Sequence, residues 1–205
     1  MSTFDDMFGG HRVMAVLRGC PPAQTVELAT RAWDLGIEVV EVPIGDRDQV
    51  PSLVAAARAA TERGMCVGAG TVVSVEQVWV ATEAGARYTV APGLDLDVLA
   101  ASLAGDMPHL PGVATATEVQ RARAAGCGWV KAFPAASLGP AWFSAMREPF
   151  PDLSYVAIGG ISAHNAAAFL AAGARMVAVG AALADPAEAE QLVSLASERV
   201  ASGTG

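Results

Sequence analysis

The sequence predicts an α/β fold, a single-domain (β/α)8 barrel, and three observations lead to it. Short apolar segments alternate with segments of helical periodicity along the 205 residues. The apolar segments are rich in valine and mostly continuous, as expected for parallel strands that are covered on both faces. Glycine recurs where successive helical segments end, which gives the chain a repeating βα unit.

Eight strands are expected, with helical segments between them. Apolar residues recur at i, i+3, i+4 and i+7 from Val50 to Ala57, which is the spacing of one buried helix face. Capping boxes that begin helices are expected at Ser74–Gln77 and Thr115–Glu118. In chain order, the expected strands are Val13–Leu17, Ile37–Pro43, Met65–Ala69, Tyr88–Ala91, Met107–Leu110, Trp129–Phe133, Tyr155–Ile158 and Met176–Val179.

Six glycines stand just before an expected strand, where a helix C-terminus favours a residue with positive φ. They are Gly36, Gly64, Gly85, Gly105, Gly126 and Gly173. Their spacings are 28, 21, 20, 21 and 47 residues, and the last has room for two units. Eight such units predict one closed barrel over residues 1–205, with 201–205 as a disordered tail. An open, doubly wound sheet is the alternative, and the lack of a glycine-rich turn after the first strand disfavours it.

Composition excludes several classes of protein. The net charge is −8 and no basic run interrupts the chain, so a nucleic-acid partner is not expected. No apolar stretch reaches membrane-spanning length, and the first ten residues lack the pattern of a signal peptide. The three cysteines are widely spaced, as in a reduced, cytoplasmic protein. The low charged fraction, 17%, indicates either buried subunit surface or a compact core.

The sequence contains none of the common metal-binding motifs. The three histidines, His11, His109 and His164, form no HxH or HExxH motif, and no CxxC exists. We interpret each histidine as a surface or helix-start residue rather than a ligand. No metal and no cofactor are therefore expected.

The chemistry of such a barrel lies on the loops that follow the C-terminal ends of its strands. Side chains and glycines that follow the expected strands are therefore the candidate site. They include Arg18, Glu41, Thr71, Pro92, Lys131, Phe133, Gly159, Gly160, Gly180 and Ala181.

Lys131 is the only lysine, since the other 12 basic residues are arginine. Arginine stays protonated and cannot act as a nucleophile, whereas a buried lysine with a lowered pKa can. The apolar segment around Lys131 would supply that burial. The alternative is a lysine that reaches the rim or pairs with a carboxylate.

Glu41 interrupts the apolar segment Val39–Ile44. A buried carboxylate is costly unless it is paired or its pKa is raised, and a raised pKa suits proton transfer near neutral pH. The alternative is a structural ion pair with an arginine or with Lys131.

Glycines after the last two strands, Gly159, Gly160 and Gly180, stand where barrels often bind phosphate through backbone N–H groups. Tight turns use such glycines as well.

At these residues the chain resembles the 2-keto-3-deoxy-6-phosphogluconate / 2-keto-3-deoxy-6-phosphogalactonate aldolase family, and is closer to the galactonate type. The resemblance implies a metal-free homotrimeric barrel in which Lys131 forms the imine and Glu41 transfers protons. Arg18 and Thr71 would contact the substrate, Pro92 would line the pyruvate pocket, and Gly159, Gly160 and Gly180 would hold phosphate. The segments that carry it are Ala15–Gly19, Glu41–Ile44, Gly68–Val72, Ala91–Gly93, Pro111–Gly112, Lys131–Pro134 and Ile158–Ser162.

Two positions depart from the family pattern. Gly45 stands where the gluconate type has an arginine, and Ala181 stands where the family usually has a serine. The hypothesis is a class I aldolase that cleaves a 2-keto-3-deoxy-6-phospho sugar acid to pyruvate and glyceraldehyde 3-phosphate. Two alternatives are an aldolase for an unphosphorylated acid such as 4-hydroxy-2-oxoglutarate, and a non-catalytic sugar-phosphate-binding barrel.

Overall fold

The computed structural model describes residues 3–180 and 186–197. Ala181 and the expected tail 201–205 lie outside the described residues, and the single domain over 1–205 stays a prediction. The strands are β1 (Val13–Val16), β2 (Val39–Pro43), β3 (Val67–Gly70), β4 (Thr89–Val90), β5 (His109–Leu110), β6 (Gly112–Val113), β7 (Trp129–Ala132), β8 (Ser154–Ile158) and β9 (Met176–Val179). The helices are α1 (Phe4–Phe8), α2 (Pro22–Asp34), η1 (Arg47–Gln49), α3 (Val50–Glu62), α4 (Val75–Glu83), α5 (Leu96–Ala104), α6 (Ala116–Ala124), α7 (Ala135–Leu138), α8 (Pro140–Arg147), α9 (Ala163–Ala171) and α10 (Pro186–Ser197).

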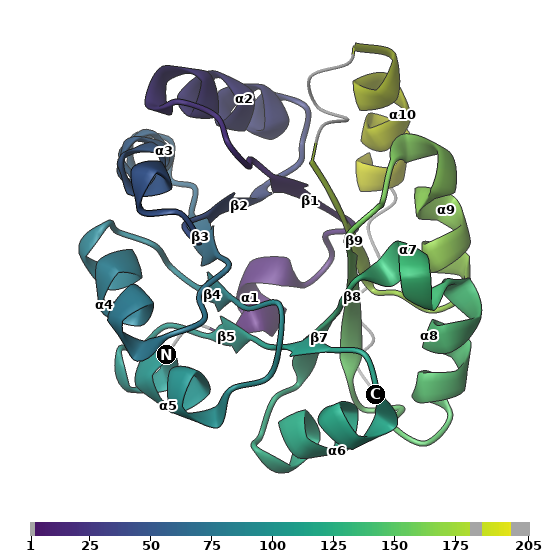
Figure 1. The fold of residues 1–205 in the computed structure, drawn as a ribbon. Helices are drawn as coiled ribbons and strands as arrows, with labels where there is room; N and C mark the ends of the chain where they lie inside the picture. Colours follow the sequence, from purple (N-terminus) through teal and green to yellow (C-terminus); the bar gives the residue numbers. More distant parts are fainter. Residues whose placement is uncertain (1–2, 181–185, 198–205) are drawn as a thin grey trace.

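The parallel strands form one sheet that closes on itself. Their order is β5-β4-β3-β2-β1-β9-β8-β7-β6, so the two end strands are β5 and β6. Only Pro111 separates these two strands in the chain, and the ring is therefore completed by continuous backbone. Figure 1 looks along this ring, with the helices arranged around its outside. The predicted (β/α)8 barrel is confirmed, and the open sheet is excluded.

The expected fifth strand divides in two. We expected Met107–Leu110, whereas the structure has β5 at His109–Leu110, paired with β4, and β6 at Gly112–Val113, paired with β7. Proline has no N–H to donate to a ladder, which accounts for the break at Pro111. Its carbonyl still accepts a 2.8 Å hydrogen bond from the Lys131 N–H.

Alternate residues of a strand face opposite sides of the barrel wall. In β7, Trp129 packs inside the barrel, as does Phe133 just after the strand, whereas Val130 and Ala132 pack under the helices. Lys131 lies between Trp129 and Phe133 in this alternation and therefore faces inward. The same rule turns Glu41 of β2 inward.

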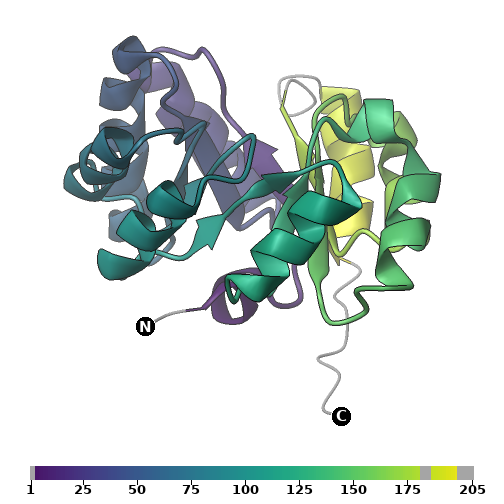
Figure 2. The same ribbon diagram turned by 60° about the horizontal axis from the view of Figure 1, so that its bottom comes forward.

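Helix α1 closes the N-terminal end of the barrel, behind the strands in Figure 1 and below them in Figure 2. The Phe8 ring lies edge-on to Tyr88 and Trp129, with centroids 5.1 and 5.6 Å apart. Trp129 Nε1 donates a 2.9 Å hydrogen bond to Asp5 Oδ1 in the same helix. The sequence analysis did not predict α1, because five residues are too few to show helical periodicity. Its capping box, Thr3 with Asp6, was the available signal.

The helix-end glycines mostly behave as expected. Five of the six have positive φ, and Gly105 does not. There the left-handed conformation falls on the next residue, Asp106, at φ +57°. The Thr115–Glu118 capping box is complete. In the Ser74–Gln77 box, the Gln77 N–H donates to Ser74 Oγ as expected. The Gln77 side chain accepts from the Val73 N–H rather than from the Ser74 N–H that a complete capping box would use.

The interpretation of the histidines as surface residues was wrong for His109. Its side chain is 3% exposed and lies between β5 and α5, where Nδ1 is 2.8 Å from Thr89 Oγ1. The neighbouring strand β4 supplies the hydroxyl partner, Thr89, which in turn contacts Ser102 of α5, and a single sequence does not reveal either contact.

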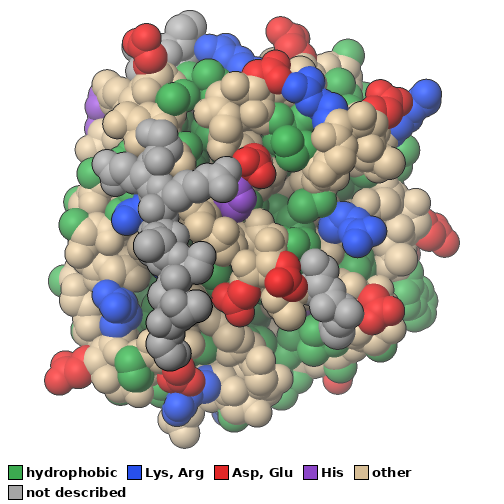
Figure 3. Space-filling model, turned by 180° about the vertical axis from the view of Figure 1, so that it is seen from behind, with side chains coloured by type: hydrophobic (Ala, Val, Ile, Leu, Met, Phe, Trp, Pro, Cys, Tyr) green, Lys and Arg blue, Asp and Glu red, His purple; other side chains and the backbone are tan. Residues whose placement is uncertain are grey.

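Other expectations concern what the chain lacks. Within residues 3–180 and 186–197, no helix is both long enough and apolar enough to cross a membrane. In the same residues no three His, Cys, Asp or Glu side chains gather as metal ligands would. All three cysteines are free. Figure 3 shows the N-terminal face of the barrel, where acidic and basic side chains are intermixed.

Candidate active site

A cavity of about 760 Å³ opens at the C-terminal end of the barrel strands. It brings together side chains that lie far apart in the sequence. Among the residues lining it are the nine candidates that the structure describes: Arg18, Glu41, Thr71, Pro92, Lys131, Phe133, Gly159, Gly160 and Gly180.

Lys131 reaches this cavity from the inner face of β7. Lys131 is 2% exposed, and its Nζ lies 4.9 Å from the centroid of the Phe133 ring. Because the strand carries Trp129 and Phe133 on the same face, the amine has apolar neighbours on its own element. Lys131 does not extend to solvent, which removes the first alternative for it.

Glu41 reaches the cavity from β2, across the barrel from β7. Its side chain is 1% exposed, and neither carboxylate oxygen has a hydrogen-bond partner among the described residues. Of the ion pairs within 4.0 Å in that part of the chain, none includes Glu41 or Lys131. The structural ion pair proposed as the alternative for Glu41 is therefore absent there.

Burial shifts the pKa values of Lys131 and Glu41 in opposite directions. It lowers the pKa of Lys131, an effect that Glu41 opposes and Arg18 reinforces. Burial raises the pKa of Glu41, and the positive charges of Lys131 and Arg18 oppose that rise. Each shift favours the neutral form, so the cavity holds an amine that can be a nucleophile and a carboxyl group that can hold a proton.

Two inward-facing glycines of β3 make room for side chains from the neighbouring strands. A Cβ on Gly70 would overlap the Glu41 carboxylate, and a Cβ on Gly68 would overlap the Tyr88 ring. The Tyr88 hydroxyl donates a 2.7 Å hydrogen bond to the Val40 carbonyl. The Gly-Ala-Gly segment thus shapes the wall against which Glu41 lies.

Arg18 and Thr71 meet at the mouth of the cavity. Arg18 Nη2 donates to Thr71 Oγ1 at 3.4 Å. Thr71 has φ +58°, a strained conformation for a β-branched residue and one that tends to occur at functional sites. A Cβ on Gly45 would come within 2.6 Å of Thr71 Cγ2, so glycine at position 45 accommodates the threonine.

The remaining candidates also line the cavity. Pro92 follows β4, and a Cβ on Gly112 would overlap its carbonyl. Gly159 and Gly160 have φ of +98° and +73°, and Gly160 O accepts from Asn165 Nδ2 at 2.9 Å.

A carboxylate of the chain itself lies near the expected anion site. The Ala163 N–H, at the start of α9, donates to Glu188 Oε2 at 3.3 Å. The helix N-terminus therefore already has an anionic partner. Any phosphate bound nearby would rely on the glycines rather than on this N–H group.

A family model described as the KDPG and KHG aldolase matches residues 5–196. The chain belongs to this aldolase family. A probable 2-dehydro-3-deoxy-6-phosphogalactonate aldolase from Rhizobium meliloti (strain 1021) is 34% identical over 175 residues, covering 85% of this chain and 82% of the relative. The 2-dehydro-3-deoxy-6-phosphogalactonate aldolase of Escherichia coli (strain K12) is 31% identical, and 82% of each chain is covered.

A solved structure of KDPG aldolase from Legionella pneumophila, with pyruvate captured as a covalent carbinolamine, superposes with a TM-score of 0.79 at 27% identity. The match covers 94% of each chain. The expected family membership is thus confirmed. It agrees with the hypothesis of an enzyme and disfavours the non-catalytic barrel.

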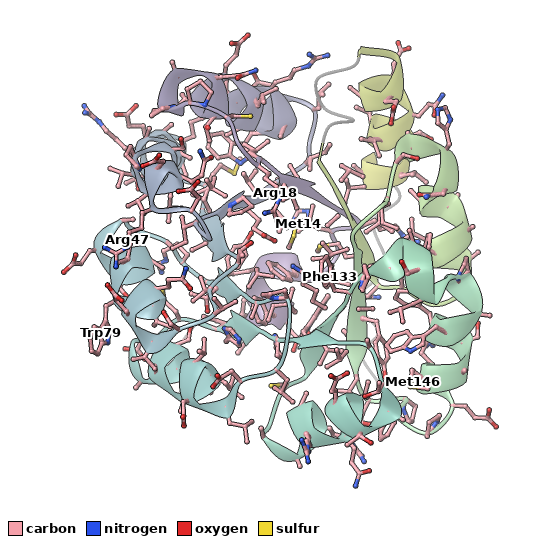
Figure 4. The ribbon with its side chains drawn as sticks, in the orientation of Figure 1. Met14, Arg18, Arg47, Trp79, Phe133 and Met146 are labelled. Atoms are coloured by element: carbon pink, nitrogen blue, oxygen red, sulfur yellow. The ribbon has the colours of Figure 1, made fainter. Side chains whose placement is uncertain are left out.

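No arginine of the η1 segment replaces the one that the gluconate type has at position 45. Arg47 lies two residues further on, but Figure 4 shows it pointing away from the barrel, whereas Arg18 and Phe133 point toward the centre. Its guanidinium pairs with Glu76 at 2.7 Å on the outer surface. Among the described residues that line this aldolase cavity, Arg18 is the only arginine.

Sequence reasoning missed several residues that line the cavity. Cys20 and Gln24 follow β1 and lie beyond Arg18, the residue predicted from that loop. Ile158 and Ala178 are inward-facing residues of β8 and β9, and the alternation of each strand was the signal that could have found them.

Proposed function

We propose that this aldolase cleaves a 2-keto-3-deoxy-6-phospho sugar acid, phosphogalactonate or phosphogluconate, to pyruvate and glyceraldehyde 3-phosphate. The observation that carries the proposal is that a buried amine, Lys131, and a buried carboxylate, Glu41, line the same cavity. The relatives named as phosphogalactonate aldolases support the substrate class.

Lys131 is the residue that would form the Schiff base. Its neutral amine attacks the C2 ketone, and loss of water gives an iminium ion. The electrons of the C3–C4 bond move into this iminium as the bond breaks, which leaves an enamine on Lys131 and releases the aldehyde. The lowered pKa of Lys131 keeps part of the amine neutral for the attack.

Glu41 would move the protons. Its carboxylate accepts the proton of the C4 hydroxyl, directly or through a water, as the C3–C4 bond breaks. The same proton is then delivered to C3 of the enamine, and hydrolysis of the resulting imine frees pyruvate. Burial raises the pKa of Glu41, which helps the group to hold the proton between the two steps.

The rim would position the two ends of the substrate. Arg18 and Thr71 would bind the carboxylate or hydroxyls, and Pro92 and Phe133 would pack beside the pyruvate part. Gly159, Gly160 and Gly180, together with Ala181, which follows Gly180 in the sequence, would hold the phosphate through backbone N–H groups.

We further propose that the enzyme works as a homotrimer in the cytoplasm. Free cysteines in three separate places support a reducing compartment. The low charged fraction supports buried subunit surface, and the outer side of α4 exposes Trp79, which is 64% exposed.

Borohydride reduction in the presence of pyruvate tests the role of Lys131. One reduced adduct should form per chain, and peptide mapping should place it at Lys131, because the N-terminal amine is the only other primary amine. Lys131→Arg should abolish both the adduct and cleavage. An active enzyme with no label on Lys131 would overturn the class I mechanism.

An aldolase for an unphosphorylated acid such as 4-hydroxy-2-oxoglutarate is the second candidate. Glu188 at the start of α9 favours it, because its carboxylate stands near the expected phosphate position. The absence of a hydroxyl at Ala181 agrees with this. Comparing kcat/KM for one sugar acid with and without its 6-phosphate, for both C4 epimers, decides between the two. Equal values for the two forms would favour the unphosphorylated substrate.

A further inference from the structure

Three arginines line a second cavity, at the N-terminal end of the barrel. Its volume is about 350 Å³, which lies within the range of small-molecule sites. Arg12 precedes β1, Arg175 precedes β9, and Ser154 is the first residue of β8, so three neighbouring strands begin at this pocket. Arg147 and Gly173 come from the ends of α8 and α9. We call this cavity the basal pocket.

The basal pocket is positive in an acidic protein. Among the described residues that line it, three carry a guanidinium group and one, Asp5, carries a carboxylate, in a chain whose net charge is −8. Asp5 Oδ1 already accepts a hydrogen bond from Trp129 Nε1 at 2.9 Å. Like charges repel when they share a cavity, and an anion between them removes that repulsion.

Arg147, which is exposed, and Arg175 both line the basal pocket. Gly173 has φ +108° and no side chain, and the Arg147 side chain lies against it, so a Cβ there would come within 2.7 Å of Nη1. Arg175 is half-buried at the start of β9. Over residues 3–180 and 186–197, none of the ion pairs includes either guanidinium.

We propose that the basal pocket binds a small multivalent anion, a phosphate ester or pyrophosphate, through Arg147 and Arg175 with the Ser154 hydroxyl beside them. Guanidinium groups offer a planar fork of donors that matches phosphate oxygens. The site is distinct from the cavity of Lys131, because parallel strands of four to five residues separate the two ends of the barrel by roughly 13 Å. The inference is independent of the proposed substrate.

Calorimetric titration with inorganic pyrophosphate at an ionic strength of about 0.1 M, where the Debye length is about 10 Å, tests the site. In the double variant Arg147→Gln/Arg175→Gln, binding should weaken at least about ten-fold. The matched control is Arg47→Gln/Arg58→Gln, which removes the same charge from side chains that are 87% and 84% exposed. The control should weaken binding less than about two-fold, because screened surface charges act weakly at a distance.

Gly160→Ala separates this site from the active site, because it alters the glycines that would hold a phosphate there, and binding to the basal pocket should persist in that variant. Arg175→Lys keeps the positive charge but loses the planar donors of the guanidinium, and it should weaken binding about three-fold or more. It replaces the double variant if that variant does not fold. A parallel titration with citrate distinguishes phosphate from carboxylate recognition. Equal losses in the pocket and control variants, or binding that Gly160→Ala abolishes, would overturn the proposal.

Discussion

Gly70 leaves the space that the Glu41 carboxylate occupies. The two residues lie on neighbouring strands, where Glu41 is in register with Gly68 and Pro43 with Gly70. Because a Cβ on Gly70 would overlap Glu41 Oε1, the glycine fixes where the buried carboxylate can lie. Gly70, which is not among the described residues that line the cavity, therefore controls the position of the candidate proton-transfer group.

Gly70→Ala should lower kcat by about ten-fold or more, because a displacement of about 1 Å at a reacting group is costly. Gly70 does not have a positive φ, so alanine is compatible with the backbone and the fold should survive. Gly128→Ala is the control, since a Cβ there meets nothing within 4 Å. Steady-state kinetics and far-ultraviolet circular dichroism provide the measurements. Unchanged kcat in Gly70→Ala would mean that Glu41 adjusts without loss.

Glu41→Gln keeps the shape of the side chain and removes its proton chemistry. We expect kcat to fall by about 10²–10⁴-fold, the usual contribution of a positioned acid-base group. The imine with pyruvate should still form, because Lys131 supplies that step. The measurements are steady-state cleavage and borohydride trapping on the same samples. A variant that loses trapping and cleavage equally would assign Glu41 to the placement of Lys131 instead.

Arg18→Met should move the pH dependence of imine formation. Arg18 helps to lower the pKa of Lys131, after burial, so its removal should raise that pKa. The amine is reactive when neutral, and its neutral fraction grows as pH rises through the pKa. The midpoint should therefore shift to higher pH in the variant.

The rate of borohydride trapping at saturating pyruvate, followed over pH, measures the midpoint. Arg47→Met is the control, because its guanidinium pairs with Glu76 on the outer surface. A shift to lower pH, or none, would show that Arg18 does not set the charge state of Lys131.

The fold was predictable because its repeat is local. Strands buried on both faces give continuous apolar runs, and the helices between them carry their own end signals. Lys131 and Glu41 stood out for a related reason, since a charged residue inside an apolar strand is conspicuous in any sequence. Their placement in one cavity then followed from the parallel arrangement of the strands.

Other features depend on contacts between distant residues. The need for glycine at Gly68 and Gly70 comes from Tyr88 and Glu41, which belong to other strands. The division of the fifth strand depends on pairing with two different neighbours. The burial of His109 depends on the Thr89 hydroxyl of β4, which contacts Ser102 of α5, and no local pattern in the sequence indicates these contacts.

The hydrogen bonds around His109 fix its tautomer. Ser102 Oγ donates to the Met107 carbonyl at 3.0 Å, so it must accept from Thr89 Oγ1, 2.6 Å away. Thr89 Oγ1 must then accept from His109 Nδ1 at 2.8 Å. The proton of the neutral ring is therefore on Nδ1, and Nε2 is buried with no partner among the residues that the structure describes.

Protonation of His109 should destabilise the fold in acid. Burial lowers its pKa from 6.5 to about 4, an effect that Asp95 opposes. Between these values the unfolded chain binds more protons than the folded one, so the stabilisation is complete above pH 6.5 and is lost as the pH falls toward 4. The shift corresponds to about 3 kcal/mol of unfolding free energy at pH 4.

In His109→Asn the amide can still donate to Thr89, and the drop in unfolding free energy between pH 7 and pH 4 should be smaller by about that amount. Urea unfolding over this range measures it, with the exposed His164→Asn as the control, and a drop in His109→Asn as steep as that of the wild type would show that His109 is protonated equally in both states.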